Sequence, residues 1–210
     1  MNYSEITEAA KRYVDRSDYE VSESMDIFIS MAEARINRML KTYEQTHRIF
    51  TATKDGYEFY TLPSDYNGMR SIQFNTLIAD SEESKVFPME YVTPETMSQY
   101  KQIGLTGGYY YSIVAQQIQV YPTLTSGGSI EILFYRKVPS LSNQNPTNWC
   151  SDSNPDIYLS GICAEIATFV KDYDAASGWD AKMSRAISEL KDSDFDKRWT
   201  GTPIATKVIR

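Results

Sequence analysis

Apolar residues recur at steps of three and four between residues 22 and 43, and polar residues fill the positions between them. This spacing places the apolar side chains in one stripe along a helix of 3.6 residues per turn. The stripe consists of Met25, Phe28, Ile29, Ala32, Ile36, Met39 and Leu40. Ser22 or Ser24 can cap the amino end of this helix. Arg35 and Arg38 lie toward its carboxyl end, where the helix dipole favours cations.

The same spacing recurs near both ends of the chain. It predicts a first helix over residues 4–16, a later helix over 155–173 that opens with Asn154-Pro155, and a final helix after Gly178. The connecting loops are short, and each apolar stripe needs a partner. We therefore expect the two amino-terminal and two carboxyl-terminal helices to pack against each other.

Between these helices the period changes from 3.6 to 2, which predicts β-strands. Strands over 46–53 and 57–62 flank Lys54-Asp55-Gly56, so we expect them to pair as a hairpin with Asp-Gly at the bend. Thr93-Pro94 predicts the start of a short helix that reaches about Tyr100. Residues 81–85 and 139–155 are expected to be loops. The remaining predicted strands cover 69–74, 77–79, 109–115, 117–121 and 129–138.

The order of helices, strands and helices predicts an α+β fold. In this fold the amino- and carboxyl-terminal helices form an antiparallel helical bundle, and an antiparallel β-sheet region is inserted between its halves. The expected domains are a helical bundle domain of residues 1–45 and 154–196, an inserted β-rich region of residues 46–153, and a carboxyl-terminal docking tail of residues 197–210.

The composition is that of an ordinary globular protein. The chain has 210 residues, which is long enough to bury a sizeable core. Of these residues, 41% are hydrophobic and 23% are charged. No apolar run approaches the roughly 18 to 20 residues of a membrane-spanning helix. Glu5 and Glu8 stand where a signal peptide would be basic and then apolar, so we expect a cytoplasmic protein or one assembled there. Cys150 and Cys163 are interpreted as free thiols, with a disulfide as the alternative.

The net charge and the tyrosine content narrow the choice of function. A formal charge of −7 argues against a protein that grips nucleic-acid phosphates, because such affinity comes mostly from Lys and Arg. The chain contains 16 tyrosines. This number suggests strands with large half-buried faces, or subunit interfaces where the ring packs and the hydroxyl remains hydrated.

The sequence contains no convincing catalytic or ligand-binding motif. The single histidine, His47, has no accompanying Gly-x-Ser-x-Gly turn or nucleophilic cysteine, so we interpret it as structural or surface. Glu82-Glu83 lies in a segment typical of a solvated loop. Gly104–Gly108 lacks the Lys-Ser/Thr of a phosphate-binding loop. We therefore predict no catalytic residues, no cofactor and no metal, and a protein that is not an enzyme.

Two groups of residues are candidates for contacts with neighbouring copies. Tyr109, Tyr110 and Tyr111 favour core or interface packing, although such a run can also stack bases or sugars. Arg35 and Arg38 can pair with acidic groups of another copy, or form local pairs on an exposed helix face.

The last eleven residues are too apolar for a solvated tail and too irregular to fold alone, which favours a peptide that docks on another subunit. The candidate docking residues are Thr200, Pro203, Ile204, Lys207, Val208, Ile209 and Arg210.

Taken in order, several packing motifs between residues 27 and 190 resemble those of the head-to-tail adaptor proteins of short-tailed bacteriophages, the group that includes tail tubular protein A. The motifs are Ile29-x-x-Ala32-x-x-x-Ile36-x-x-x-Leu40, Leu62-Pro63-x-Asp65-Tyr66, Tyr121-Pro122, Ile132-x-Phe134-Tyr135 with Pro139-x-Leu141, Pro155-Asp156-x-Tyr158-Leu159, and the Trp179 helix. Each motif alone is weakly specific.

The resemblance implies a structural protein of the virion at the head–tail junction, assembled in the host cytoplasm. It implies a homo-oligomeric ring, a dodecamer, bound to the portal protein above and to a tail nozzle or hub protein below. DNA would pass through the channel without sequence-specific binding, which an acidic wall favours, and no membrane is involved. The resemblance also implies that the carboxyl-terminal segment, residues 200–210, docks on the portal.

Two other functions remain open from the sequence. One is a different phage tail or baseplate connector with the same architecture and another neighbour. The other is a carbohydrate-binding or hydrolytic module, for which Tyr109, Tyr110 and Tyr111 would form the aromatic platform.

Overall fold

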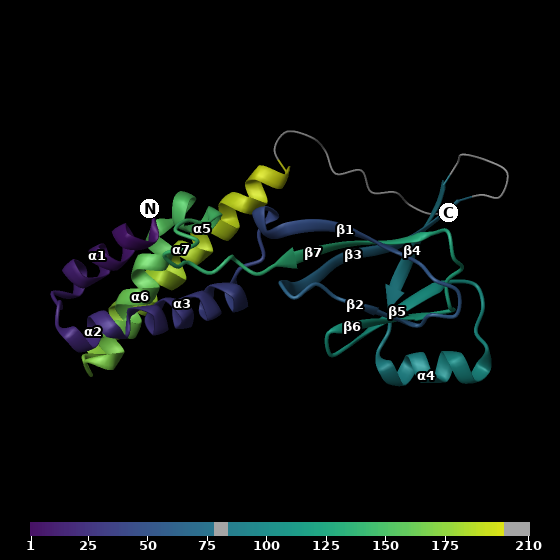
Figure 1. Cartoon of the computed structure of the whole chain (residues 1–210), viewed down its shortest axis with the longest axis horizontal. Coiled ribbons are helices and arrows are strands. Elements are labelled where there is room, and N and C mark those ends of the chain that lie inside the picture. The colour runs from purple at the N-terminus through teal and green to yellow at the C-terminus, as the bar shows by residue number, and fades with distance from the viewer. Residues whose placement is uncertain (78–83, 200–210) are drawn as a thin grey trace. The chain divides into compact units, whose positions relative to one another are not determined.

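The computed structural model describes residues 1–77 and 84–199. The chain divides into two compact units. Among the described residues, the helical unit contains Met1–Glu44 and Val138–Trp199, and the sheet unit lies within Gln45–Lys137. Figure 1 labels their elements. The chain therefore leaves the helical unit once, builds the sheet unit, and returns.

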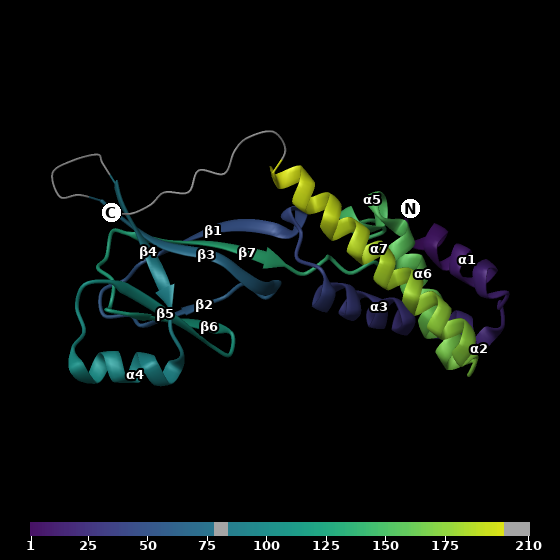
Figure 2. The same cartoon turned by 180° about the vertical axis from the view of Figure 1, so that it is seen from behind.

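Six α-helices build the described part of the helical unit. They are α1 (Tyr3–Val14), α2 (Tyr19–Glu23), α3 (Met25–Met39), α5 (Trp149–Ser153), α6 (Pro155–Phe169) and α7 (Tyr173–Trp199). Both α1 and α3 pack on α6, and α7 runs beside α6 (Figure 2). Side chains from all six helices share one core with Val138 and Leu141. The expected packing of the early helices on the late ones is confirmed.

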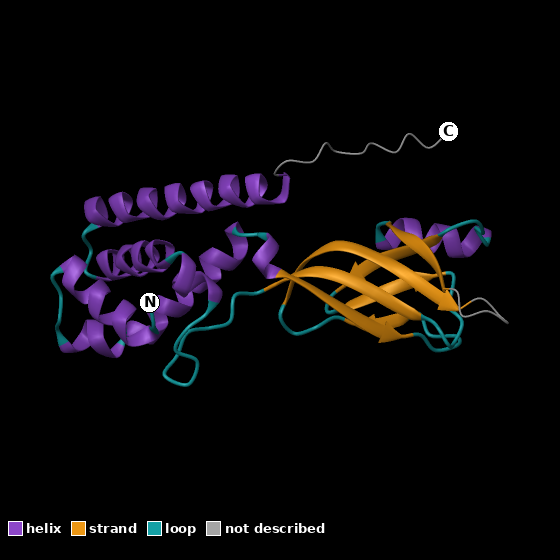
Figure 3. Ribbon diagram, turned by 90° about the horizontal axis from the view of Figure 1, so that it is seen from above, coloured by secondary structure: helices purple, strands orange, loops and turns teal. Residues whose placement is uncertain are grey.

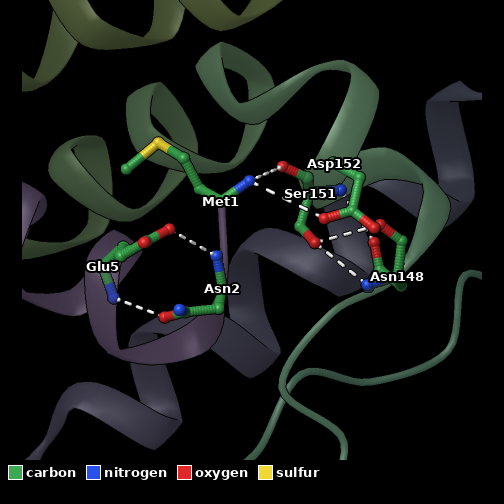
Figure 4. Close-up of polar contacts among 6 residues, drawn as sticks. All are labelled: Met1, Asn2, Glu5, Asn148, Ser151 and Asp152. Atoms are coloured by element: carbon green, nitrogen blue, oxygen red, sulfur yellow. Dashed lines mark hydrogen bonds and ion pairs between the residues drawn. The ribbon is translucent and has the colours of Figure 1, made fainter.

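Side-chain hydrogen bonds cap the amino ends of α1, α2 and α5. Asn2 accepts the backbone N–H of Glu5, and the Glu5 carboxylate accepts the backbone N–H of Asn2, which completes a capping box on α1 (Figure 4). Asn148 and Ser151 form the same reciprocal pair on α5. Asp18, rather than Ser22 or Ser24, provides the side-chain cap before the predicted helix, and it caps the separate helix α2.

The helix α6 is buried on nearly every side, as expected for a helix that is apolar around its whole circumference. Gly161 lies where α6 passes both α3 and α7. A Cβ atom there would stand 3.2 Å from Cβ of Ala32 and 3.2 Å from Cε of Met183. Glycine therefore permits a close approach of three helices.

We expect Gly161→Leu to lower the free energy of unfolding by about 2 kcal/mol, because the added side chain overpacks this crossing. Urea denaturation followed by circular dichroism measures the change. Gly178→Leu in α7 is the matched control, since nothing lies within 4 Å of a Cβ at that position. Its effect should be neutral or stabilising by up to about 0.5 kcal/mol. Equal losses at both positions would contradict this account.

The described residues of the sheet unit form seven strands and one α-helix. They are β1 (Thr46–Ala52), β2 (Phe59–Thr61), β3 (Tyr66–Leu77), β4 (Ser84–Tyr91), α4 (Pro94–Ile103), β5 (Tyr109–Val114), β6 (Gln117–Tyr121) and β7 (Ser129–Arg136). The strand order is β1-β7-β3-β4-β5-β6-β2. Neighbouring strands are antiparallel except β4 and β5, which are parallel.

The sheet is curled (Figure 3). Its two end strands, β1 and β2, are joined by the short segment 53–58. Six extended residues span at most about 20 Å, so the ends of the sheet cannot lie far apart. The curl encloses a second core centred on Phe74, Ile118, Val120, Ile130, Ile132 and Phe134. Each unit therefore has a hydrophobic core of its own.

The predicted architecture, a helical bundle with an inserted antiparallel sheet region, is wrong, although the fold is α+β. The sheet is a seven-stranded mixed body with its own core. The error has a physical cause in the segment β4–α4–β5. Two parallel neighbours need a crossover connection, and α4 supplies it. The sequence pattern hid β4, because Pro88 interrupts it and its side chains do not alternate between polar and apolar.

The hairpin predicted at Lys54-Asp55-Gly56 is also wrong. The turn exists, with Tyr57 N–H donating to the Lys54 carbonyl at 3.2 Å. However, β1 pairs with β7 and β2 pairs with β6. Backbone partners from distant strands therefore replaced the local pairing that the turn alone favours.

The other predicted helix and strand boundaries differ less from those in the structure. The region 139–155, expected to be a loop, includes α5, and α7 begins at Tyr173 rather than after Gly178. The helix predicted after Thr93 is confirmed as α4, with Thr93 accepting the Thr96 N–H. Leu77 ends β3, and the rest of the short strand predicted at 77–79 lies outside the described residues.

A polar cluster lies on the face of β7 opposite the sheet core. The Glu131 carboxylate accepts hydrogen bonds from Arg48 on β1 and from the side chains of Gln73, at 2.7 Å, and Asn75, at 3.2 Å, on β3. The hydrogen bond from Arg48 is the main cause that lowers the pKa of Glu131 to about 2. The cluster therefore ties three neighbouring strands together through one carboxylate.

We expect the sheet unit to lose stability as the pH falls from about 4.3, the usual pKa of Glu, to about 2. The sign follows because a lowered folded-state pKa stabilises the fold only while the carboxylate is ionised. Urea midpoints measured between pH 5 and pH 2.5 test this, and Glu131→Gln should flatten the dependence. Glu90→Gln, at an exposed carboxylate of β4, is the control. An unchanged slope in Glu131→Gln would refute the assignment.

Candidate assembly surfaces

The predicted docking residues Thr200, Pro203, Ile204, Lys207, Val208, Ile209 and Arg210 lie outside the described residues. Residues 197–199, assigned to the tail from the sequence, are the last turn of α7. Arg198 in this turn pairs with Asp194 at 2.8 Å. Asp194 also accepts the backbone N–H of Tyr43 at 2.7 Å. The helix that precedes the candidate docking segment is thus anchored to the helical unit through Asp194.

The two arginines predicted at a subunit interface differ in their surroundings. Arg35 pairs within its own chain with Glu165 of α6, at 3.5 Å, and with Asp180 of α7, at 2.7 Å. It therefore joins three helices of the helical unit. Arg38 lies one turn further along α3 and is exposed.

The three tyrosines of β5 face alternate sides of the sheet, as successive residues of a strand must. The Tyr109 ring contacts Phe74 and Phe87, each at 5.2 Å between ring centroids, and Tyr111 is buried beside Tyr91. Tyr110 lies against Tyr100 of α4, with ring centroids 4.9 Å apart. The three rings therefore do not form one continuous platform of the kind that stacks sugars.

A depression of about 460 Å³ lies beside these tyrosines in the sheet unit. Its lining residues are Phe87, Pro88, Glu90, Thr106, Gly107, Gly108, Tyr109, Tyr110 and Pro122. Gly107 and Gly108 border this depression, and they are followed by strand β5 rather than by a phosphate-binding helix.

The helical unit exposes apolar side chains between α3 and α6. Ile27 is 60% exposed, Met31 47% and Phe169 46%. We call these three residues the α3/α6 ridge. They border a shallow groove of about 230 Å³ that is completed by Ser24, Phe28, Glu165 and Thr168. Large apolar side chains clustered in this way are typical of an interaction site.

A second depression, of about 310 Å³, opens between α1, α6 and α7. We call it the α1/α7 hollow. Tyr13, 60% exposed, and Trp179 form its aromatic wall, with ring centroids 5.9 Å apart. Lys182 Nζ lies 4.3 Å from the centroid of the Trp179 ring, a cation–π contact. The complete lining is Tyr13, Asp156, Leu159, Ser160, Trp179, Lys182, Arg185, Ala186 and Glu189.

The sequence patterns did not identify these two surfaces. The periodicity of α3 identified its buried stripe, and Ile27 and Met31 fall on the other face. Their spacing of four residues is itself a signal, because two exposed apolar residues one turn apart form a second, shorter stripe. Phe169 lies at the end of α6 and is partly exposed.

His47 and the two cysteines were the residues whose side chains could take part in catalysis or metal binding, and each makes contacts typical of a structural residue. The His47 ring packs edge-on against Phe134, with centroids 5.8 Å apart. Cys150 and Cys163 are free and fully buried, and burial raises the pKa of each thiol to about 12. Within residues 1–77 and 84–199, no group of three or more His, Cys, Asp or Glu side chains is placed to hold a metal ion. Among the described helices, none is long and apolar enough to span a bilayer.

A family model described as SU10 adaptor protein matches residues 1–207. The chain belongs to the SU10 adaptor protein family. This is a family of phage head–tail adaptors, so the SU10 adaptor chain is a structural phage protein and part of the virion. This adaptor family is not known as an enzyme family. No curated protein matches the chain. The narrower subgroup of tail tubular protein A-like adaptors is not established by this match.

Proposed function

We propose that this SU10 adaptor forms a dodecameric ring between the portal and the tail nozzle or hub, and that the ring extends the DNA channel. The match of the adaptor family over residues 1–207 carries the proposal. In this role the protein works by shape and contact: one set of surfaces joins copies, another holds the portal, and a third holds the tail.

The exposed surfaces of the helical unit support a ring. A closed ring of identical subunits needs two different contact patches on each copy, because every copy meets two neighbours in a head-to-tail manner. The α3/α6 ridge and the α1/α7 hollow are two separate patches of this kind. Ile27 and Tyr13, one in each patch, are 60% exposed, and a contact with a neighbouring copy would bury them.

We further propose that residues 200–210 dock on the portal. The anchored end of α7 delivers this segment from a fixed point, since Asp194 holds both Arg198 and the backbone of Tyr43. A peptide that starts from a fixed helix loses less freedom on binding than one at the end of a mobile chain. Its apolar residues supply the contact area.

The net charge of −7 supports passage of DNA. An acidic channel wall repels phosphates, so that DNA moves past it without the counterion-releasing contacts that hold it in place.

Imaging tests the proposal. The purified protein is mixed with portal rings of the same phage and examined by cryo-electron microscopy, with the portal rings alone as control. We expect twelve copies attached to one face of the portal. A chain that never binds the portal, or that binds a different tail or baseplate component instead, would refute it.

A further inference from the structure

We propose that the depression beside β5 binds an extended segment of a partner protein, and that this segment carries a lysine or arginine side chain. We call the depression the β4/β5 notch. Its volume of about 460 Å³ lies within the range of about 300–1,000 Å³ that is typical of binding pockets. The inference goes beyond the proposed ring, because it concerns the sheet unit and names the chemistry of what binds there. The lining residues are Phe87, Pro88, Glu90, Thr106, Gly107, Gly108, Tyr109, Tyr110 and Pro122.

The notch lies where the pairing of two neighbouring strands stops short. Strand β4 pairs with β3 over residues 84–88, but with β5 only over residues 89–91. If the parallel register continued toward the start of both strands, residues 106–108 would pair with residues 86–88. They do not, and residues from both of these segments line the notch. The notch is therefore an open position between two strands of one sheet.

The backbone of β4 faces this open position. Along a strand, the N–H and C=O groups of successive residues point alternately to its two sides. Just after β4, the Val92 N–H donates to the Tyr111 carbonyl of β5 at 2.9 Å. By this alternation, Val86 also directs its N–H and C=O toward the β5 side, at a level where β5 has not yet begun. An extended segment that enters the notch can pair with Val86, as peptides do when they add to a sheet edge.

The side chains around the notch favour a cation. Glu90 and Tyr110 are direct partners in the β4–β5 register, so their side chains lie next to each other on one face of the sheet. The rings of Phe87 and Tyr109 also line the notch. A carboxylate beside aromatic rings attracts an ammonium or guanidinium group through its charge, and the ring faces add cation–π attraction. A basic side chain therefore fits this surface.

No cation on the neighbouring described elements offsets the charge of Glu90. None of the lining residues is a lysine or arginine, and Glu90 makes no ion pair with a described residue. Lys101 of α4 is already paired with Glu58. Lys85 is separated from Glu90 by an odd number of residues, which places it on the opposite face of β4. The notch thus offers a carboxylate that a basic partner can neutralise.

Peptide binding to the full-length protein tests the inference. The probe is a fluorescein-labelled nine-residue peptide that alternates valine and lysine, and the control peptide has glutamate in place of lysine. Fluorescence polarisation measures both affinities. Glu90→Gln removes the charge and keeps the shape of the side chain, with Glu95→Gln, in the first turn of α4, as its matched control. Val86→Pro removes an N–H that faces away from β3, a change that a strand edge tolerates. Val86→Ala keeps this N–H and is the second control.

We expect the lysine peptide to bind at least tenfold more tightly than the glutamate peptide. Glu90→Gln should weaken its binding about fivefold, and Val86→Pro about tenfold relative to Val86→Ala. Urea midpoints show that each variant is folded.

Three results would overturn the inference. Equal binding of the two peptides, no binding of either, or equal affinities of Glu90→Gln and Glu95→Gln would rule out a basic occupant. Equal affinities of Val86→Pro and Val86→Ala would rule out pairing with β4. Tenfold tighter binding by a chain that ends at Trp199 would mean that residues 200–210 of the chain itself, rather than a partner protein, occupy the notch.

Discussion

Replacing Glu33 with alanine is expected to lower the free energy of unfolding by about 3 kcal/mol. The carboxylate is 5% exposed and accepts the backbone N–H of Leu141 at 2.7 Å and the hydroxyl of Tyr158 at 3.2 Å. Both donors are buried, and an unsatisfied buried donor costs about 1–3 kcal/mol. Urea denaturation of the full chain, followed by circular dichroism and tryptophan fluorescence, measures the loss.

The position of Glu33 explains why the effect is large. Asn37, one turn along α3, accepts the backbone N–H of Val138 at 2.8 Å. The two side chains together hold the segment where the chain re-enters the helical unit. Asn148 completes the network by donating to the carbonyl of Pro139 at 2.6 Å and to the Tyr158 hydroxyl at 2.8 Å. Removing Glu33 therefore loosens the return segment as well as the helix packing.

Glu33→Gln is the matched control. Its amide oxygen can accept the same two hydrogen bonds from Leu141 and Tyr158, and it carries no charge. Burial is the main cause that raises the pKa of Glu33, so the pocket already disfavours the ionised form. We expect Glu33→Gln to stay within about 1 kcal/mol of the natural protein. A loss as large as that of Glu33→Ala would show that the charge itself, rather than the accepted hydrogen bonds, stabilises this site.

The helices were largely predictable from the sequence because their signals are local. The cap at Thr93, the proline at position 155 and the apolar stripe of α3 each depend on residues within a few turns. The helix α6, whose periodic pattern is weak, is nevertheless the centre of the helical unit. A helix that is apolar on all sides has little periodicity to detect. The pattern therefore predicted where α6 begins in the chain, but not that it is the central helix.

The sheet could not be predicted in the same way, since its pairings join residues far apart in the chain. Thr46 pairs with Tyr135, and Gln73 pairs with both Pro88 and Glu131. No local sequence pattern indicates which strands pair with each other. The Asp55-Gly56 turn favoured a hairpin, but the strands on either side of it found better partners in β7 and β6.

Contact surfaces are harder to predict than cores. A buried stripe is a repeating pattern, whereas the α3/α6 ridge consists of two residues of α3 and one of α6, brought together by packing. The sequence directed attention to Arg35 and to the tyrosines of β5, which are large or charged. The structure places Arg35 and Tyr111 mainly in contacts within the chain. Residue type alone therefore did not distinguish an interface from an internal contact.

A chain ending at Trp199 is expected to lose about 1,000-fold in affinity for the portal ring. Residues 200–210 include Ile204, Val208 and Ile209. Burying each such side chain contributes about 1.5–3 kcal/mol. Even after the cost of ordering the segment, about 4 kcal/mol of binding energy remains, and each 1.4 kcal/mol corresponds to a tenfold change in affinity. Surface plasmon resonance on immobilised portal rings measures the change.

The same truncation should leave the fold intact, because the described residues of the helical unit already form a continuous core from α1 to α7. We expect nearly unchanged circular dichroism and the same urea midpoint. The full-length double variant Ile204→Asp, Val208→Asp keeps the chain length and should lose portal binding to a similar degree, whereas Lys207→Ala should lose far less. Loss of helical signal on truncation would mean that residues 200–210 belong to the core. Full portal binding by the truncated chain would assign portal recognition to another surface.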